Sequence, residues 1–189
     1  METNRLEAFS DGVMAIILTI TVLAFKTPAG AGWRDAAHLV PQVLSYFLSF
    51  LFVAIYWVNH HIALKDVERV NVKVLWCNNA LLFFMSFVPF LTGWVGEHLG
   101  APVPLFWYFF DMFLTGVAFH LMMYFIAKEA GTKFCLDLRS VCTIAGYLAA
   151  AGLGFVHPAA SYIVGTAVNL WWLHSKRTDR ILDDHCDRK

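Results

Sequence analysis

An arginine, a serine and an aspartate stand at the start of the first long apolar stretch of this chain. Arg5, Ser10 and Asp11 lead directly into the run Gly-Val-Met-Ala-Ile-Ile-Leu-Thr-Ile-Thr-Val-Leu. Ionisable groups near hydrocarbon are costly unless other groups pair with them, so their presence at a membrane span favours a functional role. The chemistry open to them is hydrogen bonding and ion pairing with polar side chains of neighbouring helices. The elements that position them must therefore be membrane helices.

The composition indicates an integral membrane protein. The 189 residues are 59% hydrophobic and 15% charged, whereas soluble domains carry about 25% charged residues. With this balance most helices are apolar on every side, which lipid tolerates and water does not. The four cysteines show neither a CxxC pair nor metal-ligand spacing, and no long hydrophilic segment could form a catalytic module. We expect an all-α membrane protein that is not an enzyme, with no cofactor, no resident metal and no nucleic-acid partner.

Six segments are long and apolar enough to cross the bilayer core, which needs about 20 residues of helix. Glycine, proline and charged residues separate them. The expected spans are about 6–25, 37–63, 73–96, 102–127, 136–155 and 158–175. We therefore expect residues 1–175 to form one six-helix transmembrane domain, and residues 176–189 to form a charged cytoplasmic tail.

The distribution of lysine and arginine predicts the orientation. All 14 basic residues except Lys26 and Arg34 fall in the N-terminus, the loops after the second and fourth spans, and the C-terminal tail. Cytoplasmic loops carry the excess of basic residues. Both termini are therefore expected in the cytoplasm, and an even number of spans agrees with this because it puts both termini on the same side.

The first span divides into an apolar stripe and a polar patch. At 100° per residue, Ile16, Ile20 and Leu23 lie within about 60° of one another, and Thr19 lies about 60° from Ile16. Asp11 points about 140° away from Ile16. From spacing alone, the stripe could equally face lipid or a neighbouring helix.

Polar residues on three spans are expected at one depth. With the N-terminus inside, Ser10 and Asp11 lie just above the cytoplasmic boundary, level with residues 57–61 of the second span and with asparagines 78 and 79 of the third. Such groups can satisfy one another within a bundle, although each could also be solvated separately at the interface. The candidate members of this network are Arg5, Phe9, Ser10, Asp11, Trp57, His60 and Asn79.

The segment Arg5-x-x-x-Phe9-Ser10-Asp11 resembles the first-helix signature of the transmembrane protein 175 family of potassium channels. The run Tyr-Trp-x-x-His-His at 56–61 and the Pro-Phe pair at 89–90 are weaker similarities. The chain lacks the Thr-Val-Gly-Tyr-Gly filter of ordinary potassium channels, so its selectivity must arise in another way.

The resemblance implies a pore lined by first helices, narrowest at an isoleucine eleven residues after the signature arginine. That position is Ile16, with further apolar rings at Ile20 and Leu23 and a pore-facing Thr19. A ring of isoleucines can gate by dewetting. Because this chain has a single six-helix repeat, the pore would need four chains, as in a homotetramer.

The sequence therefore predicts a passive potassium channel of the bacterial inner membrane, whose partners are permeant potassium ions, lipid and copies of itself. The main alternative is a proton-coupled or cation secondary transporter. Such a carrier would predict inverted repeats and broken helices at mid-membrane, and the two three-span halves share no visible pattern. An intramembrane enzyme would need a nucleophile, base or metal constellation, and none is visible.

Overall fold

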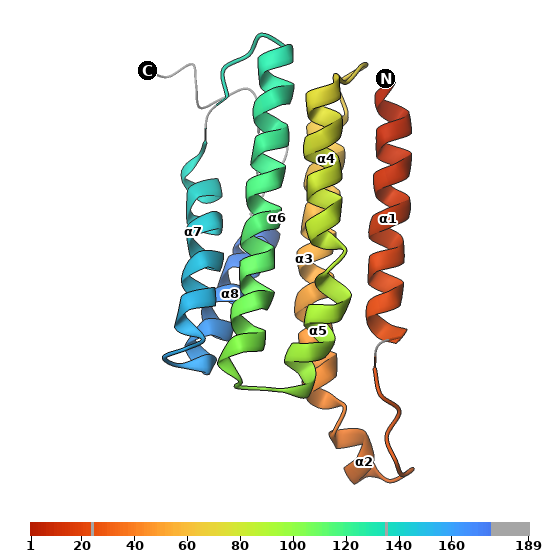
Figure 1. Cartoon of the computed structure of the whole chain (residues 1–189), viewed down its shortest axis with the longest axis vertical. Coiled ribbons are helices and arrows are strands. Elements are labelled where there is room, and N and C mark those ends of the chain that lie inside the picture. The colour runs from red at the N-terminus through yellow and green to blue at the C-terminus, as the bar shows by residue number, and fades with distance from the viewer. Residues whose placement is uncertain (24, 135, 175–189) are drawn as a thin grey trace.

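The structure is a computed structural model that describes residues 1–23, 25–134 and 136–174, and Figure 1 shows it as a bundle of helices running side by side. The expected all-α fold is confirmed, and the described residues contain no strand beyond an isolated bridge between Glu2 and Arg69. The helices are α1 Thr3–Leu23, α2 Trp33–Ala37, α3 Val40–Leu64, α4 Val72–Met85, α5 Val88–Glu97, α6 Pro102–Glu129, α7 Leu138–Leu153 and α8 Pro158–His174.

These helices form six columns, because α4 and α5 follow one another along a single line and α2 is a short turn between α1 and α3 (Figure 1). The segments Thr3–Leu23, Trp33–Leu64, Val72–Glu97 and Pro102–Glu129 are long and apolar enough to cross a membrane, and α7 is a shorter apolar helix. The proposed tail 176–189 lies outside the described residues.

The third expected span, 73–96, is interrupted in the structure. Helix α4 ends at Met85 and α5 begins at Val88, with Pro89 in the first turn of α5. Proline lacks an N–H and its ring clashes with the carbonyl four residues earlier, so it favours a helix start and disfavours continuation. At the end of α4, the Phe83 carbonyl accepts from the Ser86 hydroxyl at 2.6 Å and from the Ser86 backbone N–H at 3.2 Å.

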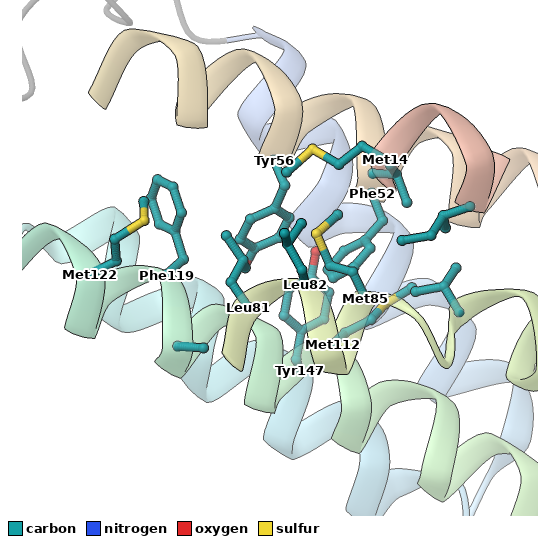
Figure 2. Close-up of a cluster of buried hydrophobic side chains, with 14 of the residues drawn as sticks. Met14, Phe52, Tyr56, Leu81, Leu82, Met85, Met112, Phe119, Met122 and Tyr147 are labelled. Carbon is teal, nitrogen blue, oxygen red and sulfur yellow. The ribbon is translucent and has the colours of Figure 1, made fainter. Parts of the chain in front are cut away.

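The core of the bundle is apolar and aromatic. Figure 2 shows side chains of α1, α3, α4, α6 and α7 meeting in one cluster. Phe52 and Tyr147 meet edge to face with ring centroids 5.9 Å apart, and Tyr56 and Phe119 do so at 5.5 Å. Edge-to-face contacts of this kind are favourable beyond the area they bury. These two ring contacts join α3 to α7 and α3 to α6 without a side chain of α1.

Helix α8 packs closely on α6 and α7 because glycines remove side chains at the contacts. A Cβ at Gly165 would lie 2.1 Å from the ring of Phe109, and one at Gly146 would lie 2.6 Å from Val168. Small residues at helix contacts allow such close approach within membranes. Helix α1 lies at the opposite edge of the bundle, where it packs only against α3, α4 and α5 among the principal helix contacts (Figure 1).

Candidate functional site

Helix α1 has one buried face and one open face. Its buried positions recur every three or four residues and end in a hydroxyl at Thr21. On the other side, Ile16 is 56% exposed and Leu23 is 79% exposed, with Ile20 and Thr19 open between them. The stripe expected from spacing is therefore an exposed surface in the single chain, and large apolar side chains on such a surface need lipid or protein to cover them.

Thr19 is the hydroxyl on this stripe. Its Oγ1 donates to the carbonyl oxygens of Ala15 at 3.2 Å and Ile16 at 3.0 Å, within its own helix. A hydroxyl has one hydrogen and two lone pairs. The hydrogen is used by the helix, so the exposed Thr19 offers acceptor lone pairs to whatever lies outside.

A groove runs beside the stripe, between α1 and the α4–α5 junction. Its volume is about 500 Å³, and its wall is almost wholly apolar. The lining residues are Val13, Ile16, Ile17, Ile20, Ser86, Pro89 and Phe90. Ile16 and Ile20 thus stand between the open face of α1 and this groove, and the helix break places Pro89 and Phe90 against them.

Opposite the open face, α1 is held by a buried polar cluster. We call it the Asn78 cluster; it consists of Ser10 on α1, His60 on α3 and Asn78 on α4, each at most 1% exposed. Asn78 Nδ2 donates to Ser10 Oγ at 3.0 Å, and His60 Nε2 lies 2.8 Å from Asn78 Oδ1. An amide oxygen only accepts, so Nε2 carries the hydrogen. Ser10 also donates to the carbonyl of Leu6 at 2.9 Å.

A second bond joins α1 to α3 at the protein surface. Trp57 Nε1 donates to Asp11 Oδ1 at 2.8 Å, and both side chains are exposed. One turn away, the Glu7 carboxylate lies 3.5 Å from His61 Nδ1. The start of α1 is also tied by backbone bonds to the α3–α4 loop, from Thr3 N–H to the Glu68 carbonyl.

The structure thus brings some of the expected network residues together and leaves others apart. Ser10 and His60 join the buried cluster, and Asp11 bonds to Trp57. Arg5 and Phe9 are exposed on α1 and lie outside both sets of described bonds, as does Asn79. Its neighbour Asn78 occupies the cluster instead. A signal for this exists in the sequence: Asn78 continues the four-residue spacing of buried Val74 and Leu82, and Asn79 does not.

Sequence reasoning missed a second buried cluster, on the other side of the α4–α5 junction. We call it the Ser49 cluster; it consists of Ser49 on α3, Thr92 on α5 and Tyr108 on α6. Ser49 Oγ lies 2.6 Å from Thr92 Oγ1 and 2.7 Å from the Tyr108 hydroxyl oxygen. The four-residue spacing of Ser45 and Ser49 on α3 was the available signal, since it puts two hydroxyls on one helix face.

The described residues contain no group of three or more histidine, cysteine, aspartate or glutamate side chains able to hold a metal ion. Asp111 on α6 is buried, and its Oδ2 has no hydrogen-bond partner among the residues described; the same holds for Thr115 Oγ1. These two residues are four apart on one face of α6, and among the described residues neither atom hydrogen-bonds to the Asn78 cluster or the Ser49 cluster. The side-chain hydrogen bonds that hold α1 are therefore those of the Asn78 cluster and the Trp57–Asp11 bond.

Comparison with known proteins agrees with this architecture. Residues 5–89 match the family described as endosomal/lysosomal potassium channel TMEM175. A potassium channel of Chryseobacterium sp. (strain P1-3) is 33% identical over 195 residues, covering 98% of this chain and all of the relative. A potassium channel of Streptomyces collinus is 37% identical over 102 residues, which are 52% of this chain and 50% of that one.

A solved structure shares the fold. It is the crystal structure of a lysosomal potassium-selective channel TMEM175 homolog from Chamaesiphon minutus, with a TM-score of 0.75 and 26% identity, covering 90% of this chain and 96% of that one. The family expected from the resemblance is confirmed by the end-to-end relative and by this fold. The chain therefore belongs to the TMEM175 family of membrane ion channels and is not an enzyme.

Proposed function

We propose that this chain forms a potassium-preferring cation channel, in which four copies arrange their α1 helices around a central pore and ions pass down their gradient. The observation that carries the proposal is the open apolar stripe on α1, on a helix whose opposite face is fixed by the Asn78 cluster. A stripe held in a fixed orientation by buried hydrogen bonds is suited to form the wall of a pore. The names of the bacterial relatives support potassium as the permeant ion.

In this proposal Ile16 forms the narrowest ring, Ile20 and Leu23 form further apolar rings, and Thr19 presents its acceptor oxygen between them. A narrow apolar neck gates because it does not hold a continuous column of water. Sodium binds its hydration water more tightly than potassium, so partial dehydration at the neck costs sodium more. Selectivity for potassium then needs no ring of backbone carbonyls.

The polar residues behind the stripe act as positioning residues. Ser10, His60 and Asn78 set the rotation of α1, and the exposed Trp57–Asp11 bond adds a second hold between α1 and α3. Arg5 and Phe9, expected in this network, are exposed near the start of α1, and in this proposal they lie toward the cytoplasmic mouth of the pore. Residues 1–175 form the channel domain in the bacterial inner membrane. The termini and the basic α3–α4 and α6–α7 loops lie on its cytoplasmic side.

The first test is cation flux from liposomes that contain the purified chain, under potassium and sodium gradients. The expected result is fast downhill potassium flux that exceeds sodium flux. Single-channel recording then separates the pore from a carrier, because a pore gives unitary current steps. Absence of flux in protein shown to be folded and tetrameric, across a series of voltages and pH values, would contradict the proposal.

The constriction is tested by Ile16→Asn. An amide at the neck should hold water, raise the potassium current and weaken the preference over sodium. The matched control is Ile163→Asn on α8, which makes the same substitution at a position 69% exposed, outside the proposed pore. Unchanged current and selectivity in Ile16→Asn, or an equal change in both variants, would remove Ile16 from the constriction.

A further inference from the structure

Four charged side chains lie at the end of the bundle where α1 finishes. They are Lys26, Arg34, Asp35 and Glu97, two of each sign. Figure 1 shows that this end also carries the α5–α6 and α7–α8 connections, opposite the N-terminus. The net charge of these four side chains is therefore zero. The local charge around each cation depends on which carboxylate lies beside it.

Lys26 and Glu97 form an ion pair that joins the segment after α1 to the end of α5. Lys26 follows α1 by three residues, and Glu97 is the last residue of α5. Lys26 Nζ lies 3.0 Å from both Oε1 and Oε2 of Glu97. The residue before Lys26 also fixes this segment against α3, because the ring of Phe25 meets the ring of Tyr46 edge to face with centroids 5.7 Å apart.

The other carboxylate at this end is already engaged. Asp35 Oδ2 accepts from the backbone N–H of Gly32 at 3.0 Å and so caps the short helix α2. Glu97 is therefore the carboxylate that holds Lys26. The lysine side chain is 74% exposed, and exposed ion pairs contribute little to stability. The main effect of this ion pair is therefore expected on the electrostatic potential at the mouth and not on stability.

We propose that the Lys26–Glu97 pair sets the electrostatic potential at this mouth of the pore, and thereby the rate at which potassium enters from that side. The inference rests on the proposed function. In four copies, Lys26 forms a ring of positive charge three residues beyond Leu23, and the Glu97 ring neutralises it. Positive charge around a pore mouth lowers the local concentration of cations, and negative charge raises it.

Salt dependence follows from the exposure of the pair. In about 0.01 M salt the Debye length is about 30 Å, so four added charges act on an ion at the mouth, whereas in 1 M salt it is about 3 Å and they hardly act. For charges about 10 Å from the pore axis, the expected change in conductance is roughly fivefold at low salt and negligible at high salt.

The test is single-channel conductance of three variants in potassium chloride at both salt concentrations. Glu97→Gln leaves the lysine ring unpaired and should lower the low-salt conductance. Lys26→Gln leaves the carboxylate ring unpaired and should raise it. The double variant Lys26→Gln/Glu97→Gln restores neutrality and should return to the wild-type value. Each single change should be larger at one voltage polarity, because the ring lies at one mouth only.

The matched control is Lys128→Gln, which removes a lysine at the opposite end of α6. At the voltage polarity where Lys26→Gln changes the conductance most, Lys128→Gln should leave the conductance unchanged. If the wild-type chain conducts and all variants have the same conductance, the inference alone is overturned. The same holds if the loss of conductance in Glu97→Gln is equal at both salt concentrations, or if it persists in the double variant. A folded wild-type chain that passes no potassium overturns the proposed function and this inference together.

Discussion

The Asn78 cluster and the Ser49 cluster are built alike, and they differ in the helices that they join. Each consists of three neutral, buried side chains from three helices, with bonds between 2.6 and 3.3 Å. The Asn78 cluster joins α1 to α3 and α4, and the Ser49 cluster joins α3, α5 and α6. Because neither contains an ionised pair, neither carries the desolvation cost of buried charge.

In the proposed channel, this difference separates the bonds that position the pore helix from the bonds that hold the scaffold. Helix α1 lies at the edge of the bundle and presents the open stripe, so the Asn78 cluster fixes the rotation of that stripe (Figure 1). The Ser49 cluster joins α5, whose Pro89 and Phe90 line the groove beside the stripe, to α3 and α6. Aromatic contacts also join α3 to α6 and α7 (Figure 2). Substitutions in the two clusters should therefore separate conduction from stability.

The largest effect is expected for Asn78→Ala. It leaves His60 Nε2 and Ser10 without the partner they share, and loses about 2 kcal/mol of stability, because stranded buried groups keep their full desolvation cost. Potassium flux per folded channel should fall as well, because α1 loses its rotational hold. Thermal unfolding in detergent and liposome flux measure the two effects. The control is Asn79→Ala on the exposed neighbour; equal effects of both variants would contradict the assignment of Asn78.

Tyr108→Phe should have an intermediate effect. It removes one hydroxyl from the Ser49 cluster, while Ser49 keeps its bonds to Thr92 and to the Ser45 carbonyl. The expected loss is about 1 kcal/mol of stability, with flux per folded channel and the potassium-to-sodium ratio unchanged. A shift in selectivity with unaltered stability would show that the Ser49 cluster acts on the pore, and the contrast between the two clusters would fail.

The smallest effect is expected for Trp57→Phe. The substitution removes the indole N–H that donates to Asp11, but both side chains are exposed, so water or lipid headgroups replace the bond. Stability should change by less than about 0.5 kcal/mol, in line with other exposed positions. Differential scanning calorimetry of the purified variant checks this. The control is Trp76→Phe, at an exposed tryptophan of α4. A loss comparable to that of Asn78→Ala would place this surface bond among the main holds on α1.

The helix break and the identity of the second buried cluster illustrate what sequence reasoning could not reach. Pro89 is visible in the sequence as a proline deep within a span, yet hydropathy averages over a window and predicts one continuous helix at 73–96. The structure divides it at Ser86 and Phe87. The spacing of Ser45 and Ser49 indicates only that one face of α3 carries hydroxyls. The Ser49 cluster was missed because its partners Thr92 and Tyr108 lie far from Ser49 in the chain, so no local pattern pairs the three.

The sequence by itself determined the class of the protein, its long apolar segments and the stripe on the first helix. These depend on composition and on the 3.6-residue period, which are local quantities. The tertiary structure decided which side of each helix is buried. It selected Asn78 over Asn79, left Arg5 and Phe9 exposed, and paired Lys26 with Glu97 across 71 positions of the chain. Such choices depend on the rotation of one helix against another, which is fixed only when all the helices pack together.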